Sequence, residues 1–465
     1  MTPRFAVVGH PNKGKSSIVS TLAEDSAVAV DSIPGTTTTS RAFPMRVDGE
    51  VLYELIDTPG FQRPREVLAW LREQSAGAAD RAAAVARFVD THAGDPRFHD
   101  ECELLGPIIN GAGILYVVDG SRPYGSEYEP EMEILRWTGR PRMALINLIA
   151  DGDHTEEWHR ALDQYFSIVR VFDAVHADVQ KRLTLLQSFG ELHAPWRTAI
   201  SRAVSALEDD YQRRRESSAR LIAALLVEAL TMQRSQQISE DSDPEPVIAK
   251  AERRLREDLR DLEQTTRREI ESIYRHEDVV WGSDAPAIIE SDLFSAESEQ
   301  LFGLSRAQLV ATGAMSGAVA GGAIDIMLGG ASLFAVTGIS AVVGGLSALF
   351  GSDKLAKTKM LGQSLASREI IVGPFRDPNL PWILLGRALL HHEAIAERNH
   401  ARREALVTAI SDGTHRANAI EPELRKRLGA EFNSVRSNGI SPGDTRMEAL
   451  VGELLHQGEA EADRR

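Results

Sequence analysis

A short stretch close to the N-terminus, GHPNKGKSS, constrains the fold of this chain more than any other feature. It fits the pattern G-x-x-x-x-G-K-[ST], with Gly9, Gly14, Lys15 and Ser16 at the fixed positions. An apolar strand is expected before it and a helix after it. In that context backbone N–H groups and the helix N-terminus bind phosphate, the lysine reaches the β- and γ-phosphate oxygens, and the serine holds Mg²⁺. The stretch therefore predicts a phosphate-binding loop.

Residues 1–185 alternate between short apolar runs and helix-forming runs. This alternation predicts an α/β P-loop NTPase domain, with a mostly parallel sheet and helices on both faces. The expected strands are Phe5–Val8, Val51–Ile56, Gly113–Val118, Arg142–Leu148 and Ile168–Phe172.

Composition limits the partners and the compartment. The chain has 465 residues, 52 of them Lys or Arg and 68 Asp or Glu, for a formal net charge of −16. This balance argues against sequence-independent binding of nucleic acid, so no nucleic acid is expected as a partner. The single cysteine, Cys102, excludes an internal disulfide. The short segment before the loop leaves no room for a signal peptide, so we expect a cytoplasmic protein.

The remainder of the chain is predicted to be all-α and divides into three regions. Residues 186–300 are expected to form a helical bundle or coiled coil, because Leu255, Leu259 and Leu262 begin one apolar seam in a heavily charged run. Residues 301–352 are expected to form a Gly- and Ala-rich apolar hairpin. Residues 353–465 are expected to form a C-terminal helical region.

The apolar segment is a candidate membrane anchor. Its charge-free runs, 307–324 and 326–352, approach or exceed the roughly 20 residues that span a bilayer. Asp325 is expected at the turn between two helices. We expect residues 307–352 to associate the protein with the inner face of the cell membrane, through lipid or a membrane-protein partner. The alternative is a buried hairpin inside a soluble bundle.

An extended piece at 369–374 and a basic helix follow in the C-terminal region. Arg387, His391, Arg398 and Arg402 share one face of that helix. The face could contact lipid headgroups or an acidic partner helix. The alternative is a solvated face with internal Glu–Arg pairs.

Two further motifs narrow the class of nucleotide enzyme. Asp57-Thr58-Pro59-Gly60 follows an expected strand, and the threonine-rich loop PGTTTT, residues 34–39, lies before it. GHPNKGKSS, PGTTT and DTPGF, in this order, resemble the TrmE–Era branch of the TRAFAC class of P-loop GTPases. The whole chain also resembles bacterial GTPases with a C-terminal domain of unknown function, through ALINLIADGD, FSIVRVFDAV and LPWILLGRALLHHEAIAERNHARR.

The resemblance implies GTP and GDP as ligands, Mg²⁺ as cofactor, and GTP hydrolysis that is slow without an activator. Ser16 and Thr37 would ligate Mg²⁺, with Thr36 or Thr38 as alternatives to Thr37, and Asp57 would hold a Mg²⁺-bound water. Gly60 would be the γ-phosphate hinge of the switch II segment. The implied catalytic residues are Lys15, Asn12 and Thr37, and the implied nucleotide-binding residues are His10, Pro11, Asn12, Lys13, Gly14, Lys15, Ser16, Ser17, Gly60, Asn147 and Asp151.

The base-reading motif departs from the family pattern. The family has N-K-x-D here, in which the aspartate accepts two hydrogen bonds from guanine. This chain keeps Asn147 but loses the lysine, and the aspartate is displaced to Asp151 or Asp153. Guanine remains the expected base, with the acceptor supplied from a bulged loop.

Phe61 stands where Ras-like proteins place a water-orienting glutamine, so another group must assist hydrolysis. In TrmE-like GTPases an asparagine at the position of Asn12 helps to hold K⁺ between the β- and γ-phosphates. Its neighbour Lys13 offers a built-in ammonium for the same role. The alternative is that Lys13 points to solvent or to a second GTPase domain.

An insertion of about fifty residues, 62–112, follows switch II and carries apolar residues at helical spacing. It could transmit the γ-phosphate state to a partner or to the helical half, or it could be inert. His99, Asp100, Glu101, Cys102 and Glu103 are metal-ligand residue types, but the cluster has poor geometry for one metal.

Three functions fit these features. The first is a GTP-hydrolysing switch that works at a membrane. The second is a dynamin-like remodeller, which would form nucleotide-dependent homodimers or larger oligomers. The third is a soluble regulatory GTPase that acts by binding protein.

Overall fold

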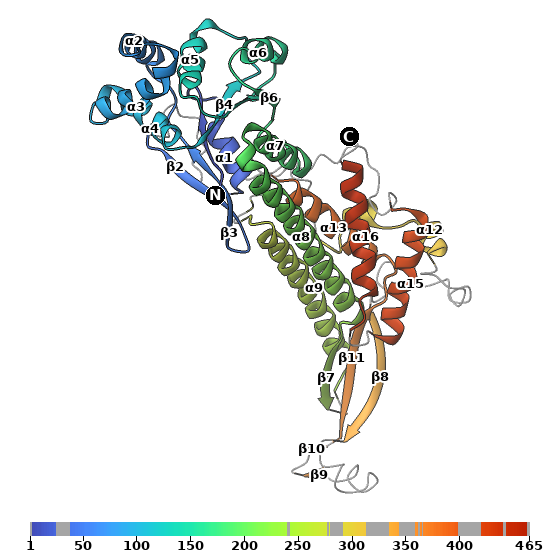
Figure 1. Ribbon diagram of the computed structural model, residues 1–465. Helices are drawn as coiled ribbons and strands as arrows, with labels where there is room; N and C mark the ends of the chain where they lie inside the picture. The colour runs from blue at the N-terminus through green and yellow to red at the C-terminus, as the bar shows by residue number, and fades with distance from the viewer. Residues whose placement is uncertain are drawn as a thin grey trace. The chain divides into compact units, whose positions relative to one another are not determined.

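The computed structural model describes residues 2–24, 38–239, 242–276, 279, 292–312, 334–343, 359–360, 363–364, 366–398, 420–439 and 443–462. The chain forms two compact units (Figure 1). The first comprises Met1–Arg213 and Glu397–Glu404, and the second comprises Arg214–Ala396 and Ala405–Arg465.

The first unit is built on a six-stranded sheet in the order β2-β3-β1-β4-β5-β6. Neighbouring strands are parallel, except that β2 runs antiparallel to β3. The strands are β1 Arg4–Val8, β2 Arg41–Val47, β3 Glu50–Asp57, β4 Gly113–Asp119, β5 Arg142–Asn147 and β6 Ile168–Val171.

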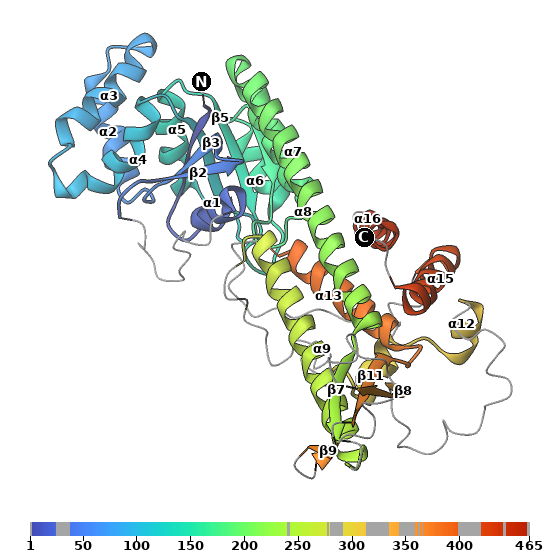
Figure 2. The same cartoon turned by 90° about the horizontal axis from the view of Figure 1, so that it is seen from below.

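Strand β1 is buried on both faces, as is typical of a parallel strand covered by helices. Phe5 and Val7 contact one core cluster, and Ala6 and Val8 contact the other. Helices on both faces of the sheet are visible in Figure 2. On the Phe5 face lie α1 Lys15–Ala23, α7 Val179–Leu192, the 3-10 turn η4 Ala194–Trp196, and the beginning of α8 Arg197–Thr231.

The opposite face is covered largely by the insertion, which the sequence placed at 62–112. The expected helical spacing there is confirmed. The elements are α2 Pro64–Gln74, η1 Ala78–Asp80, α3 Arg81–His92, η2 Pro96–Phe98 and α4 His99–Ile109, followed beyond β4 by η3 Ser126–Tyr128, α5 Glu129–Trp137 and α6 Thr155–Leu162.

All five expected strands of the first unit are confirmed, but β2 was missed. Phe43, Met45 and Val47 alternate as buried residues on this strand, and Pro44, a residue type that argues against a strand, lies at a less buried position between them. Proline cannot donate to a ladder and is tolerated on an edge strand, which is where β2 lies.

The second unit joins helices to a three-stranded antiparallel sheet in the order β7-β11-β8. Strand β11 contains the extended piece expected at 369–374. The strands are β7 Arg234–Ser239, β8 Phe334–Val343, β9 Lys359–Met360, β10 Gln363–Ser364 and β11 Ala366–Phe375, and the helices are α9 Glu245–Ile273, α11 Ala296–Phe302, α12 Arg306–Ala311, α13 Leu380–Ala396, α15 Pro422–Asn438 and α16 Arg446–Ala462.

The apolar helical hairpin expected over 301–352 is not shown. Phe334–Val343 forms strand β8, which pairs with β11, so the second expected helix is wrong over these residues. Residues 313–333 and 344–352, including Asp325, lie outside the described residues. Within the described ranges, no helix is long and apolar enough to cross a membrane.

Arg387 and His391, the first two residues of the expected basic face, are buried. The expectations of a lipid-contacting face and of a solvated face are therefore wrong for these two residues. Arg387 on α13 donates from Nε to Glu263 Oε1 of α9 at 2.7 Å. His391 Nε2 lies 3.0 Å from Glu271 Oε1, also on α9. The acidic partner helix is therefore α9 of the same unit. Arg402 lies outside the described residues.

We expect Arg387→Met to lower the free energy of unfolding of the full chain by about 3 kcal/mol, because it removes one partner of a buried ion pair. Arg427→Met is the matched control. Arg427 pairs with Glu453 in the same unit, but the two side chains are 50% and 39% exposed, so its loss costs less than about 1 kcal/mol. Urea denaturation measures both, and equal losses would contradict the prediction.

Candidate nucleotide-binding site

The phosphate-binding loop joins β1 to α1, as predicted, and two of its glycines are required by geometry. A Cβ at Gly9, where φ is +142°, would lie 2.4 Å from the carbonyl oxygen of Val117. A Cβ at Gly14, where φ is +81°, would lie 2.2 Å from Nδ2 of Asn147. Helix α1 begins at Lys15. Its first N–H groups are thus available to phosphate.

Lys15 is folded back across the loop. Its side chain is buried, and Nζ donates to the carbonyl oxygen of His10 at 3.1 Å. Burial lowers the pKa of this ammonium, while the carboxylates of Asp57 and Glu131 act in the opposite direction. The ammonium is therefore held close to where a phosphate would enter the loop.

Ser16 and Asp57 come together as a pair of hard oxygen donors. Ser16 Oγ donates to Asp57 Oδ2 at 2.9 Å. A hydroxyl beside a carboxylate is a donor set that suits Mg²⁺. Thr37, the third expected ligand, and Thr36 lie outside the described residues. Ser17 follows in the first turn of α1 and is half-buried.

The beginning of switch II lies directly against the phosphate-binding loop. A Cβ at Gly60 would lie 2.7 Å from the backbone nitrogen of Pro11, so only glycine allows this approach. Phe61 is fully buried in the core on the insertion side of the sheet. Its side chain contributes to packing and has no polar group that could orient a water molecule.

Asn147 at the end of β5 links two loops. Its Nδ2 donates to the carbonyl oxygen of Lys13 at 3.3 Å, and its Oδ1 accepts from the N–H of Ala174 at 3.2 Å. Ala174 follows β6, and Asp173-Ala174-Val175 stand where the resembled family has its final base-contact motif, S-A-K. The asparagine is thus placed to fix the base end of the site.

The two displaced aspartates differ in their contacts. Asp153 Oδ1 accepts from the N–H of Thr155, at the beginning of α6. Asp151 is exposed. Between them Gly152 has φ +131°, and a Cβ there would lie 2.6 Å from the carbonyl oxygen of Ser121. The tight loop leaves Asp151 as the better candidate for a base acceptor, because Asp153 already accepts a hydrogen bond from the backbone of Thr155.

Lys13 does not point to solvent, so the alternative of a solvent-exposed lysine is wrong. Its side chain is 8% exposed, and Nζ lies 3.6 Å from Oδ2 of Asp119 at the end of β4. The ammonium also lies 5.8 Å from the ring centroid of Tyr128. Asn12 beside it is exposed and has φ +59°, a left-handed conformation that asparagine tolerates better than most residues.

Sequence reasoning missed a buried carboxylate behind the loop. Glu131 on α5 is fully buried and accepts from His10 Nδ1 and from the Tyr116 hydroxyl, both at 2.9 Å. These two contacts satisfy a carboxylate that would otherwise be costly to bury. Half-exposed His10 therefore has a fixed ring orientation. The only sequence signal is an acidic residue in the first turn of a helix, which is common.

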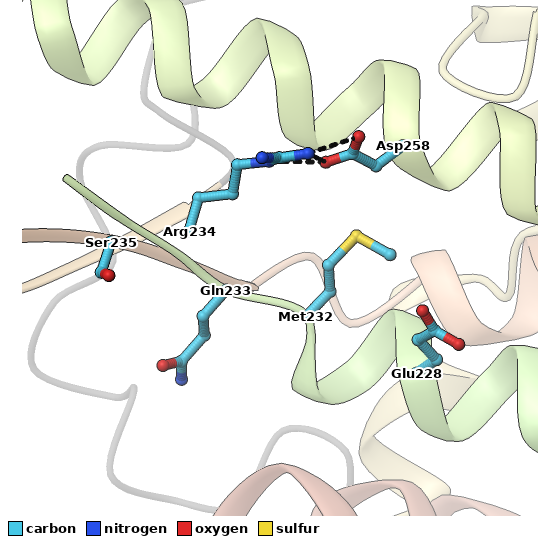
Figure 3. Close-up of a pocket in the computed structure, with 6 residues that line it drawn as sticks. All are labelled: Glu228, Met232, Gln233, Arg234, Ser235 and Asp258. Atoms are coloured by element: carbon cyan, nitrogen blue, oxygen red, sulfur yellow. Dashed lines mark hydrogen bonds and ion pairs between the residues drawn. The ribbon is translucent and has the colours of Figure 1, made fainter.

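A separate open hollow of about 460 Å³ lies in the second unit (Figure 3). Glu228, Met232, Gln233, Arg234, Ser235 and Asp258 line it. Arg234 of β7 donates from both Nε and Nη2 to Asp258 of α9, at 2.7 Å each. This bidentate pair neutralises the cation that could have bound an anion. The phosphate-binding loop is therefore the better candidate site.

The fold and the loop together define a P-loop nucleotide-binding domain. Residues 4–147 match the family described as "50S ribosome-binding GTPase". Residues 159–456 match the family described as "Domain of unknown function (DUF3482)". The second match covers more than half of the chain, so the protein belongs to the DUF3482 family, and its N-terminal domain is a TRAFAC-class GTPase domain.

Curated relatives resemble the GTPase domain alone. GTPase Der of Nitrosococcus oceani is 33% identical over 121 residues, which are 25% of this chain and 25% of that protein. GTPase Der of Mycoplasma pneumoniae is 32% identical over 119 residues, 25% of this chain and 26% of that protein. The chain thus spans about a quarter of the length of the curated relatives it matches.

Solved structures with some likeness include Era in complex with MgGDPNP and nucleotides 1506-1542 of 16S ribosomal RNA, with a TM-score of 0.30 and 14% identity over 59% of this chain and 89% of that one. NFeoB from S. thermophilus bound to GDP.AlF4- and K+ has a TM-score of 0.24 and 20% identity, over 59% and 89%. Scores this low support no functional inference. The expectation that this chain binds no nucleic acid finds no support here and stays a prediction.

We expect Gly14→Ala to weaken GDP binding at least tenfold, because the new methyl group would displace Asn147 from the loop. Gly139→Ala is the control. Gly139 also has positive φ, at +65°, but a Cβ there meets nothing within 4 Å. Both substitutions carry backbone strain of about 1–2 kcal/mol, so only the first adds the clash. Titration with a fluorescent GDP analogue measures the difference, and equal affinities would contradict the prediction.

Proposed function

We propose that this protein binds GTP with Mg²⁺, hydrolyses it to GDP and phosphate, and works as a molecular switch of the TrmE–Era type. The observation that carries the proposal is the contact between Ser16 and Asp57 beside the folded-back Lys15. These groups come from α1 and from the end of β3, which are far apart in the sequence. Phosphoryl transfer requires a cationic side chain and oxygen ligands for a metal beside the same phosphates, and these three residues lie together at the phosphate-binding loop.

Each residue has a defined role in this proposal. Lys15 neutralises the β- and γ-phosphate oxygens. Ser16 and Thr37 would ligate Mg²⁺, and Asp57 would hold a water bound to it. When bound, Mg²⁺ supplies positive charge that stabilises the transferring phosphate. The N–H of Gly60 reaches toward the γ-phosphate, and the loop from His10 to Ser17 surrounds the phosphates.

Guanine is the proposed base. Asn147 positions one side of the proposed base site through its hydrogen bonds with the backbone of Lys13 and of Ala174. The exposed carboxylate of Asp151 supplies the acceptor for the guanine N–H groups, in place of the aspartate that the usual motif places one residue earlier. The hydrogen bonds that Asp151 accepts from guanine would favour GTP over ATP, which has no matching donors.

Lys15→Ala should abolish binding of GTP and GDP, because it removes the cation that the motif places at the β- and γ-phosphates. Lys181→Ala removes an exposed lysine of the same unit and should bind as the wild type does. A competition titration with ATP tests the base in the same experiment. ATP binding as tightly as GTP would contradict guanine specificity while leaving the phosphate site intact.

We propose that a bound metal cation, and not the ammonium of a lysine side chain, assists hydrolysis. Phe61 is buried and cannot orient water. The ammonium of Lys13 is committed to Asp119, which disfavours it as a built-in substitute for an arginine finger. Asn12 is exposed on the loop, so we propose that it helps to hold K⁺ against the developing charge.

The rate of GTP hydrolysis should be at least tenfold higher in K⁺ than in Na⁺, a difference of about 1.4 kcal/mol in the barrier. Asn12→Ala should remove this acceleration, whereas Lys13→Ala should retain it. A rate that is indifferent to K⁺ but falls tenfold in Lys13→Ala would instead show that the ammonium acts at the phosphates.

The expectation that the protein works at a membrane stays a prediction. No observation within the described ranges favours membrane association through 307–352 over the other two functions, dynamin-like remodelling and soluble protein-binding regulation. The same holds for nucleotide-dependent homodimers.

A further inference from the structure

Helix α4, the last helix of the insertion, is anchored firmly to the sheet. Leu104, Leu105 and Ile108 are fully buried in the core that also contains Ala6 and Val8 of β1. The first turn of α4 precedes these residues and carries the acidic cluster that resembled a set of metal ligands. The described residues contain no group of three or more such side chains that could hold a metal. The cluster instead contacts backbone.

Glu101 holds the segment that follows Gly60. Its carboxylate is fully buried, and Oε1 accepts from the N–H of Gln62 at 2.9 Å and of Arg63 at 2.6 Å. Hydrogen bonds to an ionised acceptor are about twice as strong as neutral ones. One carboxylate oxygen therefore fixes two consecutive peptides, directly after the γ-phosphate hinge and Phe61.

Glu103 and His99 hold the segment that follows the threonine loop. Glu103 Oε2 accepts from the N–H of Ser40 at 2.8 Å and from its hydroxyl at 3.0 Å. His99 Nε2 lies 3.1 Å from the carbonyl oxygen of Thr38, to which it donates. Along the chain, Ser40 is three residues from Thr37, the expected Mg²⁺ ligand.

The spacing on the helix explains how α4 reaches both segments. His99 and Glu103 are four residues apart and lie on one face of the helix, whereas Glu101 lies about 200° around the axis. The beginning of α4 therefore contacts both the segment after the threonine-rich loop and the segment after Gly60. A shift of either segment has to break hydrogen bonds to the same turn.

We propose that Glu101 and Glu103 are positioning residues for GTP hydrolysis, which tie Ser40 and the Gln62–Arg63 segment to one part of α4 and so fix the two segments relative to each other. This inference rests on the proposed GTPase function. The neighbouring Cys102 takes no part. Burial, and then the charge of Glu101, raise the pKa of its thiol to about 11, so it stays protonated.

The test compares turnover with nucleotide affinity in the full-length protein. Glu101→Ala should lower kcat at least tenfold while the affinity for GDP changes less than threefold, because GDP lacks the γ-phosphate next to which the two segments are expected to act. Glu101→Gln keeps the shape and one acceptor oxygen but loses the charge, so an intermediate loss of about threefold is expected. Asp100→Ala changes an acid of the same turn that makes none of these contacts and should leave kcat unchanged.

Glu103→Ala tests the coupling between the segments. If one turn joins them, the double variant Glu101→Ala/Glu103→Ala should lose less activity than the product of the two single losses. Unchanged turnover in both Glu101 variants would overturn the inference. So would a fall in GDP affinity as large as the fall in kcat, since that would indicate a purely structural role. Absence of hydrolysis in the wild type would overturn the proposed function itself.

Discussion

The position of β1 in the sheet determines the rest of the site. It is buried on both faces and lies between β3 and β4, so the chain must leave the sheet at Gly9 through a gap that admits no side chain. The parallel strands β3, β4 and β5 end at the same edge, and their last residues are Asp57, Asp119 and Asn147. Each of these three reaches the phosphate-binding loop, through Ser16, Lys13 Nζ and the Lys13 carbonyl respectively. One edge of the sheet thus holds both ends of the candidate nucleotide site.

Local patterns allowed this half of the protein to be predicted. Buried parallel strands read as apolar runs, and the phosphate-binding loop has fixed spacing, so β1, α1, Asp57 and Asn147 were found from the sequence. Glu101, Glu103 and Glu131 were not recognised, because a buried glutamate looks like a surface one until its distant partners are known. Glu131, for example, is satisfied by His10 and Tyr116 from two other elements. The roles of the predicted site residues themselves stay predictions.

The second half was harder to predict, because its apolar runs are ambiguous. FAVTGISAVV, residues 334–343, is apolar and partly β-branched, and periodicity alone does not separate a buried helix from a buried strand in such a run. Its pairing with β11 decides in favour of a strand. The prediction of an exposed basic face on α13 failed for a different reason. Arginine and histidine at helical spacing indicate an exposed basic face unless acidic residues of another helix cover them, and Glu263 and Glu271 of α9 do so.

The buried charges between α9 and α13 also limit how the second unit can move. Glu263 faces Arg387, and Glu271 faces His391, in an interior that otherwise consists largely of leucine, isoleucine and phenylalanine. A slide of one helical turn, about 5.4 Å, would separate both pairs and take these buried polar groups away from their partners. Glu263 also accepts from Arg267 of its own helix, and Arg387 also donates to Ser298, so a slide would disturb these contacts as well. These contacts therefore resist sliding of α13 along α9, and they favour movement of the two helices together.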